Sequence, residues 1–399
     1  MSSVREIARK VIVDRPRAPR PPFALGAGLI AVIGLLGALA HHVTNRYWGD
    51  LAIYRFVGQL GLHGQPLYGF VTPAGLTWDY PPFTALPFLP LAFLSLDATV
   101  FVWTVSSLVA LGAVIWLTLR QTGVRDTTRR AWLTLLVGIA ALPLYPVSGH
   151  LVVGQIDVFI VLLVLGDMFG RPDSRWRGLG VGLAAGLKLT PVIFIGYLLL
   201  TRRWRAAAVA SATFAATIAA GFLYLPGNSR AYWLDGLFLR SSRVAFDPRT
   251  VHNQSLRGAL ARLLDTATPP TWLWLGLVLV VGVGGLALAV RANRRGEQTL
   301  GVLACALTGL LVSPVSWHHH WIWCVPAMIF LATLGWRARW GVAALWVMCT
   351  ASTLWVVITL TGHDLHFSGF ALAYDNAYVL VGLALLVVLG RHPRKGIRE

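Results

Sequence analysis

The stretch Ala98–Leu119 reads ATVFVWTVSSLVALGAVIWLTL and contains no charged residue. A helix of this length crosses the roughly 30 Å hydrocarbon core of a bilayer. Similar apolar runs recur along the chain, in which 56% of the 399 residues are hydrophobic and 13% are charged. Soluble domains carry about 25% charged residues. Because the runs are continuous rather than alternating, they exclude a β-barrel and predict an all-α, polytopic membrane protein.

The apolar runs predict about 10–12 transmembrane helices in one membrane domain, residues 23–390, between basic tails at 1–22 and 391–399. The expected crossings are Phe23–His42, Ala98–Leu119, Ala131–Val147, Ile156–Phe169, Ala206–Leu225, Trp272–Val290, Thr299–Val315, His320–Leu334, Trp340–Leu360 and Tyr374–Leu389. Pro81–Leu94 is short and rich in proline, which indicates a broken or re-entrant segment. Two large outer loops are expected at about 43–80 and 226–270.

The basic residues are almost all arginines, and they cluster between the apolar runs. The net charge is +18, but it is divided among short tracts such as Arg125 to Arg130 and Arg291 to Arg295. This pattern is typical of cytoplasmic loops and not of a nucleic-acid-binding face. It places both termini in the cytoplasm and the two large loops at the outer face of the membrane.

The stretch Gly178–Leu200 has arginine tracts at both ends, and one crossing helix cannot have both ends in the cytoplasm. Lys188 and Pro191 interrupt it midway. We therefore expect two half-helices whose free backbone groups line a cavity or are buried in protein.

The polar residues other than arginine fall at the outer ends of the expected helices or in the outer loops, which predicts a site at that face. They are Asp50, Asp79, His150, Gln155, Asp157, Asp235, His252, Asn253, Gln254, His318, His319, His320, His363, Asp364 and Asp375. The three cysteines, in contrast, lie inside apolar runs and are expected to be buried and free.

Two aspartates of the first outer loop are candidates for chemistry. Asp50 precedes Leu51–Leu62, whose spacing predicts a helix lying in the membrane interface. Its carboxylate suits a general base, but an aspartate there also suits the N-cap of that helix. Asp79 stands before a proline pair, where a turn residue is the simpler interpretation.

Lys188 is the one lysine away from the termini. A charge at that depth costs about 2.5–3.5 kcal/mol on insertion scales, so it should be paired or functional. A salt bridge to Asp157, at the start of an expected helix, and binding of a phosphate are equally compatible with its position. Gln155 and Asp157 lie where the free N–H groups of that helix favour an anion, although helix capping explains them as well.

The run His318-His319-His320 resembles a metal-binding tract. Consecutive helical residues point about 100° apart, so at most two of these rings share a direction, and we expect a cavity-lining histidine rather than a metal site. His252, Asn253 and Gln254 offer further hydrogen-bonding groups. Arg240 and Arg243 are cations on the outer side and are candidates for binding an anionic headgroup.

Several of these residues together resemble a known family. The matching residues are, in order, Asp50, Tyr54, Gly64-Gln65-Pro66-Leu67-Tyr68, Tyr80-Pro81-Pro82, Gly154-Gln155-Ile156-Asp157, Gly186-Leu187-Lys188-Leu189-Thr190-Pro191, Arg202-Arg203-Trp204, His252-Asn253-Gln254-Ser255 and Ser313-Pro314 ahead of the histidine run. Their order and spacing resemble glycosyltransferase family 87 over nearly the whole membrane domain.

The resemblance implies a GT-C fold and a polyprenyl-phosphate-mannose donor used at the outer face. It implies inverting transfer to the 2-hydroxyl of a mannose on a phosphatidylinositol mannoside, lipomannan or lipoarabinomannan, as in mycobacterial α-(1,2)-mannosyltransferases. Asp50 matches the catalytic base, and no metal or cofactor is required. Asp157 departs from the family's more usual asparagine and adds a second acid to the site. A transporter or flippase for lipid-linked sugar is the main alternative, and a structural scaffold would not need Lys188 in hydrocarbon.

Overall fold

The computed structural model describes residues 49–72, 76–240, 247–360 and 369–391. Helices make up its first half as α3 (Gly49–Leu62), η1 (Pro82–Phe93), α4 (Leu96–Gln121), α5 (Thr127–Ala141), α6 (Tyr145–Val153), α7 (Asp157–Met168), α8 (Leu179–Leu187), α9 (Val192–Leu200) and α10 (Trp204–Tyr224). They continue as α11 (Pro226–Ser229), η2 (Arg230–Leu234), η3 (Leu237–Leu239), α12 (Leu256–Leu263), α13 (Thr271–Arg294), α14 (Gln298–Val312), η5 (His318–Trp323), α15 (Cys324–Ala332), α16 (Trp336–Leu360), α17 (Gly369–Asp375) and α18 (Ala377–Gly390). Within the described ranges, the β-type pairing is a single isolated bridge between Asn253 and Trp317.

Three of the described helices, α4, α10 and α13, are long and apolar enough to cross a membrane. Helices α5 and α6 form a fourth candidate span, bent by 79°. The predicted all-α membrane fold is thus confirmed, but fewer described helices than expected are unbroken crossings. Several expected crossings are instead divided into shorter helices, such as η5 and α15. The first expected crossing, Phe23–His42, lies outside the described residues, as does the basic N-terminal tail.

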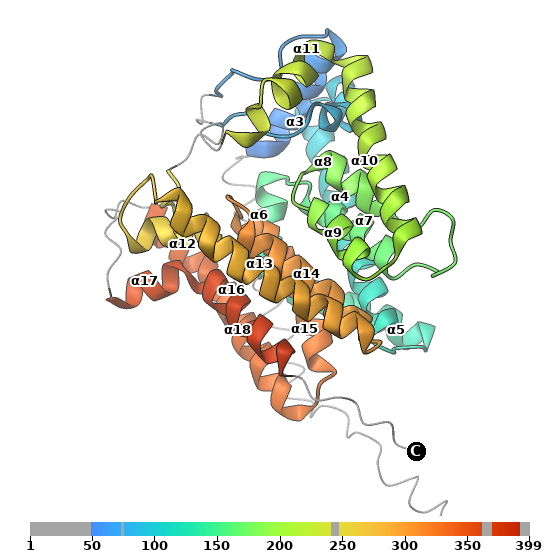
Figure 1. The fold of residues 1–399 in the computed structure, drawn as a ribbon, viewed down its shortest axis with the longest axis vertical. Coiled ribbons are helices and arrows are strands. Elements are labelled where there is room, and N and C mark those ends of the chain that lie inside the picture. The colour runs from blue at the N-terminus through green and yellow to red at the C-terminus, as the bar shows by residue number, and fades with distance from the viewer. Residues whose placement is uncertain (1–48, 73–75, 241–246, 361–368, 392–399) are drawn as a thin grey trace, which may run out of the picture.

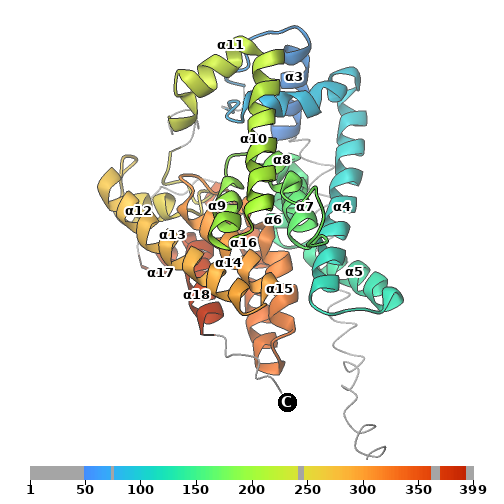
Figure 2. The same ribbon diagram turned by 45° about the vertical axis from the view of Figure 1, so that its right-hand side comes forward.

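The helices are distributed along the long axis of the molecule. In both views α3 and α11 lie together at one end of the long axis, α15 and α18 lie toward the other, and α7 and α8 lie between them (Figure 1, Figure 2). Helices α13 and α14 pack side by side across the middle. The cysteines Cys305, Cys324 and Cys349 are buried and free, as predicted.

The proline-rich segment forms η1 and packs against α3. Pro87 and Pro90 lie inside η1, where each removes a backbone donor, so a regular α-helix is disfavoured. At Gly58 of α3, a Cβ atom would lie 2.4 Å from the backbone oxygen of Phe88. This close approach brings α3 directly onto η1. The presence of α3 confirms the helix expected after Asp50, and the proline-containing η1 confirms that Pro81–Leu94 is not a regular crossing helix.

The break at Lys188 is also confirmed. Helix α8 ends at Leu187, Lys188 is extended with φ −152° and ψ 135°, and α9 begins after Pro191. Helix α8 is held against α10 by glycines at four-residue spacing: a Cβ at Gly182 or Gly186 would lie 2.5 or 2.3 Å from atoms of that helix. The half-helix is therefore fixed in place by packing, and its broken end presents the lysine to the interior.

Candidate functional site

The carboxylate of Asp50 is the first part of the site. Asp50 is the second residue of α3 and is partly buried. Its Oδ2 accepts a hydrogen bond from Gln155 Nε2 at 2.6 Å, although 105 residues separate the two. Burial raises the pKa of the Asp50 carboxyl to about 7; the charge of Asp79 adds to this effect, while the bond from Gln155 opposes it. Asp50 therefore titrates near neutral pH.

Gln155 is oriented by two tyrosines. The hydroxyls of Tyr54 and Tyr80 both donate to Gln155 Oε1 at 3.0 Å, so the amide nitrogen faces the carboxylate of Asp50. The backbone oxygen of Gln155 accepts from Trp103 Nε1 at 3.3 Å. Three side chains from distant parts of the sequence thus position one amide against one carboxylate.

A tight turn carries Gln155 to this place. Gly154 ends α6 with a φ of +72°, and a Cβ atom there would lie 2.5 Å from the Cβ of Leu51. The backbone oxygen of His150 accepts from the N–H groups of both Gly154 and Gln155 at 3.0 Å. Only a glycine allows the turn to lie this close to α3, next to Asp50.

The second part of the site surrounds Lys188. Its ammonium donates to Asp157 Oδ1 at 2.8 Å, and His320 Nε2 lies 2.8 Å from the same Nζ. Both partners of the ion pair are largely buried. The salt bridge considered from the sequence is therefore present. The ammonium also lies 5.5 Å from the ring centroid of Tyr80, whose hydroxyl belongs to the Gln155 group.

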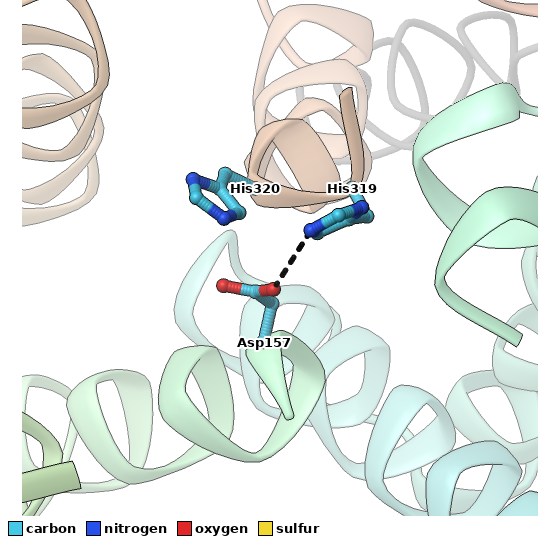
Figure 3. Close-up of side chains that lie close together, drawn as sticks. All are labelled: Asp157, His319 and His320. Atoms are coloured by element: carbon cyan, nitrogen blue, oxygen red, sulfur yellow. Dashed lines mark ion pairs between the residues drawn. The ribbon is translucent and has the colours of Figure 1, made fainter. Parts of the chain in front are cut away.

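Asp157, His319 and His320 form a compact cluster (Figure 3). The two rings lie on one side of the carboxylate, and His319 Nε2 is 3.9 Å from Asp157 Oδ2. The ligand atoms of these three residues lie within 4.8 Å of one another, a set that suits a divalent metal by residue type. However, the ammonium of Lys188 already lies against Asp157 and His320, so it occupies the position of a cation at these two residues.

His318 points to different neighbours from those of His319 and His320. Its ring lies 4.9 Å from Tyr145, 5.4 Å from His252 and 5.2 Å from Tyr378, centroid to centroid. Burial lowers the pKa of His252 to about 4, so this ring is neutral. The expectation that at most two of the three consecutive histidines share a direction is confirmed.

The side chains of Asn253 and Gln254 are engaged within the protein. Gln254 Nε2 donates to the backbone oxygens of Val251 and Asp375, and its Oε1 accepts from the backbone of Tyr378. Asn253 Oδ1 accepts from the N–H of Ser316 at 3.1 Å. These bonds fasten the loop before α12 to the segment before η5 and to α18, which favours a structural role over the expected substrate contact.

Three predicted residues remain, namely Arg240, Arg243 and Asp79. Arg240 is exposed and its guanidinium is 3.5 Å from the backbone oxygen of Asp235. Arg243 lies outside the described residues. Asp79 is partly buried and close enough to Asp50 to influence its pKa.

Sequence reasoning gave no role to three residues that the structure brings forward. Tyr80 links the two parts of the site, and the Tyr-Pro-Pro motif was a signal for it. His150 was grouped with the outer polar residues only. Arg262 of α12 is 1% exposed and donates to Asn376 Oδ1 and to backbone oxygens of the loop, a burial that no local pattern predicts.

Comparison with known proteins gives a consistent result. The profile of glycosyltransferase family 87 matches residues 78–314. The polyprenol-phosphate-mannose-dependent alpha-(1-2)-phosphatidylinositol mannoside mannosyltransferase of Mycobacterium tuberculosis is 38% identical to this chain, over 81% of each protein. Its counterpart in Mycolicibacterium smegmatis is 34% identical, over 89% of this chain and 85% of the relative.

A further relative is named for a more extended substrate. The polyprenol-phosphate-mannose-dependent alpha-(1-2)-phosphatidylinositol pentamannoside mannosyltransferase of Mycolicibacterium smegmatis is 35% identical, over 76% of this chain and 75% of the relative. No solved structure matches the chain. The family profile covers more than half of the chain and the relatives match most of it, so the family predicted from the sequence is confirmed: the chain belongs to glycosyltransferase family 87.

Proposed function

We propose that this glycosyltransferase moves mannose from a polyprenyl-phosphate donor to the 2-hydroxyl of a mannose on a phosphatidylinositol mannoside. The named activities of its relatives support the donor and the acceptor class. Lipomannan and lipoarabinomannan are larger acceptors of the same chemistry. The reaction takes place at the outer face of the plasma membrane, and the arginine-rich inner loops support this orientation.

One observation carries the proposal: a candidate base and a candidate phosphate-binding group are held by neighbouring residues of one turn. Gln155 contacts Asp50, and Asp157 contacts Lys188. Tyr80 touches both groups, with its hydroxyl on Gln155 and its ring near Lys188. Tyr80 thus lies between the candidate base and the candidate cation. This arrangement suits a displacement in which the proton and the leaving phosphate are on opposite sides of the donor mannose.

The chemistry follows from this arrangement. The acceptor 2-hydroxyl loses its proton to Asp50 while its oxygen forms a bond to the anomeric carbon of the donor mannose. On the opposite face, the bond from that carbon to the phosphate oxygen breaks, and its electron pair leaves with the polyprenyl phosphate. The configuration at the anomeric carbon is inverted. The leaving group needs its growing negative charge stabilised, and Lys188 with His320 supplies positive charge and hydrogen-bond donors for this.

The environment of Asp50 supports its role as base. A general base works best when its pKa is close to the working pH, and burial raises that of Asp50 to about 7. Gln155 and the hydroxyls of Tyr54 and Tyr80 act as positioning groups that hold the carboxylate in one orientation. No step of this scheme requires a metal or a cofactor.

The test is an assay of the purified chain in nanodiscs with radiolabelled polyprenyl-phosphate-mannose and a phosphatidylinositol mannoside. We expect a radiolabelled acceptor with one additional α-(1,2)-linked mannose. A parallel assay in sealed vesicles without acceptor measures movement of the donor across the bilayer. Movement of donor without any product would contradict the transferase and support a transporter.

A further inference from the structure

His150 has unsatisfied hydrogen-bonding capacity in the interior of the protein. Its side chain lies on α6, is 2% exposed, and neither of its ring nitrogens has a hydrogen-bond partner in the described part of the chain. About nine in ten buried polar groups in proteins are bonded, so two unpaired nitrogens on one ring need an explanation. Packing alone would be served better by an apolar ring of the same size.

The surroundings of His150 are those of the Lys188 cluster. Helix α6 packs against η5, which carries the histidine run, and the ring of His150 is within electrostatic range of Asp157 and Lys188. His319 is within range as well. His319 Nε2 is also buried without a hydrogen-bond partner in the part of the chain that the structure describes. Unpaired ring nitrogens from two histidines are therefore grouped around the Lys188–Asp157 pair, where a partner from outside the chain can bond them.

The chemistry of these groups fits an anionic oxygen. An ammonium has three N–H donors, and Lys188 directs its Nζ at Asp157 and His320, which leaves one N–H without a partner among the described residues. A neutral imidazole adds one N–H donor, so His150 and His319 supply two more. Phosphate oxygens take several such bonds at once. A divalent metal is a poorer fit, because the ammonium of Lys188 lies 2.8 Å from the carboxylate that would have to bind it.

We propose that His150 donates a hydrogen bond from its ring to a phosphate oxygen of the lipid-linked sugar donor, as an additional phosphate ligand beside Lys188 and the histidines of η5. This inference rests on the proposed function. It adds a binding residue from α6, the helix whose end also positions Gln155 through the backbone oxygen of His150. The phosphodiester of the acceptor has the same chemistry, so the test separates the two lipids.

The experiment compares the wild type with His150→Phe, His150→Asn and His150→Gln in nanodiscs. Phenylalanine keeps the ring and removes both nitrogens, whereas asparagine and glutamine keep an N–H near the position of Nδ1 and Nε2, respectively. His63→Phe, at an exposed residue directly after α3, is the matched control. Binding of polyprenyl phosphate and the KM values for donor and acceptor are measured for each, with melting temperatures as a check on folding.

We expect His150→Phe to weaken polyprenyl phosphate binding and to raise the donor KM by about 10-fold or more, the effect of losing one hydrogen bond to a charged group. The acceptor KM should stay within about 2-fold of the wild type. One of the two amide variants should recover most of the donor affinity, and it identifies the donating nitrogen. His63→Phe should behave as the wild type.

Three results would overturn the inference while leaving the proposed function intact. In the first, His150→Phe binds polyprenyl phosphate as the wild type does. In the second, the acceptor KM rises instead of the donor KM. In the third, all three variants lose affinity for both lipids together with a lower melting temperature, which assigns His150 to packing. Failure of the wild type itself to bind polyprenyl phosphate would reject the proposed function and this inference together.

Discussion

Gln155 and Asp157 stand two residues apart and hold the two functional ends of the site. The amide of Gln155 donates to Asp50 at 2.6 Å, and the carboxylate of Asp157 accepts from Lys188 at 2.8 Å. The turn that follows α6 therefore sets the distance between the candidate base and the candidate phosphate-binding cation. A change at either residue should disturb one end more than the other.

Replacing Gln155 tests the base end. Gln155→Leu removes the bond to Asp50 and the acceptor of two tyrosine hydroxyls, so we expect kcat to fall about 10- to 100-fold. The donor KM should change little, because Lys188 and Asp157 stay in place. Steady-state kinetics in nanodiscs measure both. A raised donor KM with unchanged kcat would show that Gln155 serves the donor and not the base.

The pH dependence of transfer reports the Asp50 carboxyl. Its pKa is raised to about 7, and the base must be ionised, so kcat/KM should fall tenfold per pH unit below about pH 7 and level off above it. Gln155→Glu places a second negative charge beside Asp50 and should move this limb to higher pH. Rates between pH 5 and 9 check both statements. A rate that stays level from pH 5 to pH 9 would contradict the role assigned to Asp50.

Variants of the Lys188–Asp157 ion pair should distinguish an effect on the stability of the fold from an effect on donor binding. Lys188→Met leaves a buried carboxylate without its partner, which costs about 3–5 kcal/mol, so we expect a lower melting temperature and loss of donor binding. The double variant Lys188→Met/Asp157→Asn removes both charges and should recover the melting temperature without recovering donor binding. Recovery of donor binding in the double variant would mean that the lysine is only structural.

Gly154→Ala tests the turn itself. The added Cβ meets Leu51 at 2.5 Å and the positive φ is strained, so both activity and melting temperature should fall. Gly64→Ala is the matched control, since Gly64 has a similar φ of +61° with open space around it. The control should show the backbone strain alone and keep most of the activity. Equal losses in the two variants would argue against a positioning role for the contact with Leu51.

Metal ions should inhibit rather than activate. Asp157, His319 and His320 form a ligand set that Lys188 partly occupies, so added Zn²⁺ should compete with the lysine and raise the donor KM. Treatment of the wild type with EDTA should leave transfer unchanged. Loss of activity on chelation, restored by one divalent ion, would show that the site works with a metal.

The sequence predicted those parts of the molecule that local patterns control. Arginine tracts on both sides of Lys188 required a break, and the structure has α8, an extended lysine and α9. The spacing after Asp50 predicted α3. Within the described residues, some expected crossings are divided into shorter helices, because apolar runs do not reveal where a helix such as the α5–α6 pair bends by 79°.

The parts that could not be predicted depend on contacts between distant segments. The bond from Gln155 to Asp50 joins residues 105 positions apart through the close packing of Gly154 on Leu51. Asn253 and Gln254 have the residue types of a binding motif, yet their amides are used inside the protein. From the sequence, His150 is one polar residue in an apolar segment. Only the structure shows that, among the described residues, its ring nitrogens have no hydrogen-bond partner and that its helix packs against η5.

The most direct test of the account is mannose transfer by Asp50→Asn. The variant keeps the shape of the side chain and removes the base, so transfer from polyprenyl-phosphate-mannose should fall by at least about 100-fold, with expression and donor binding unchanged. Asp97→Asn, at an exposed position in the first turn of α4, is the matched control and should transfer normally. Full transfer by Asp50→Asn would contradict the account.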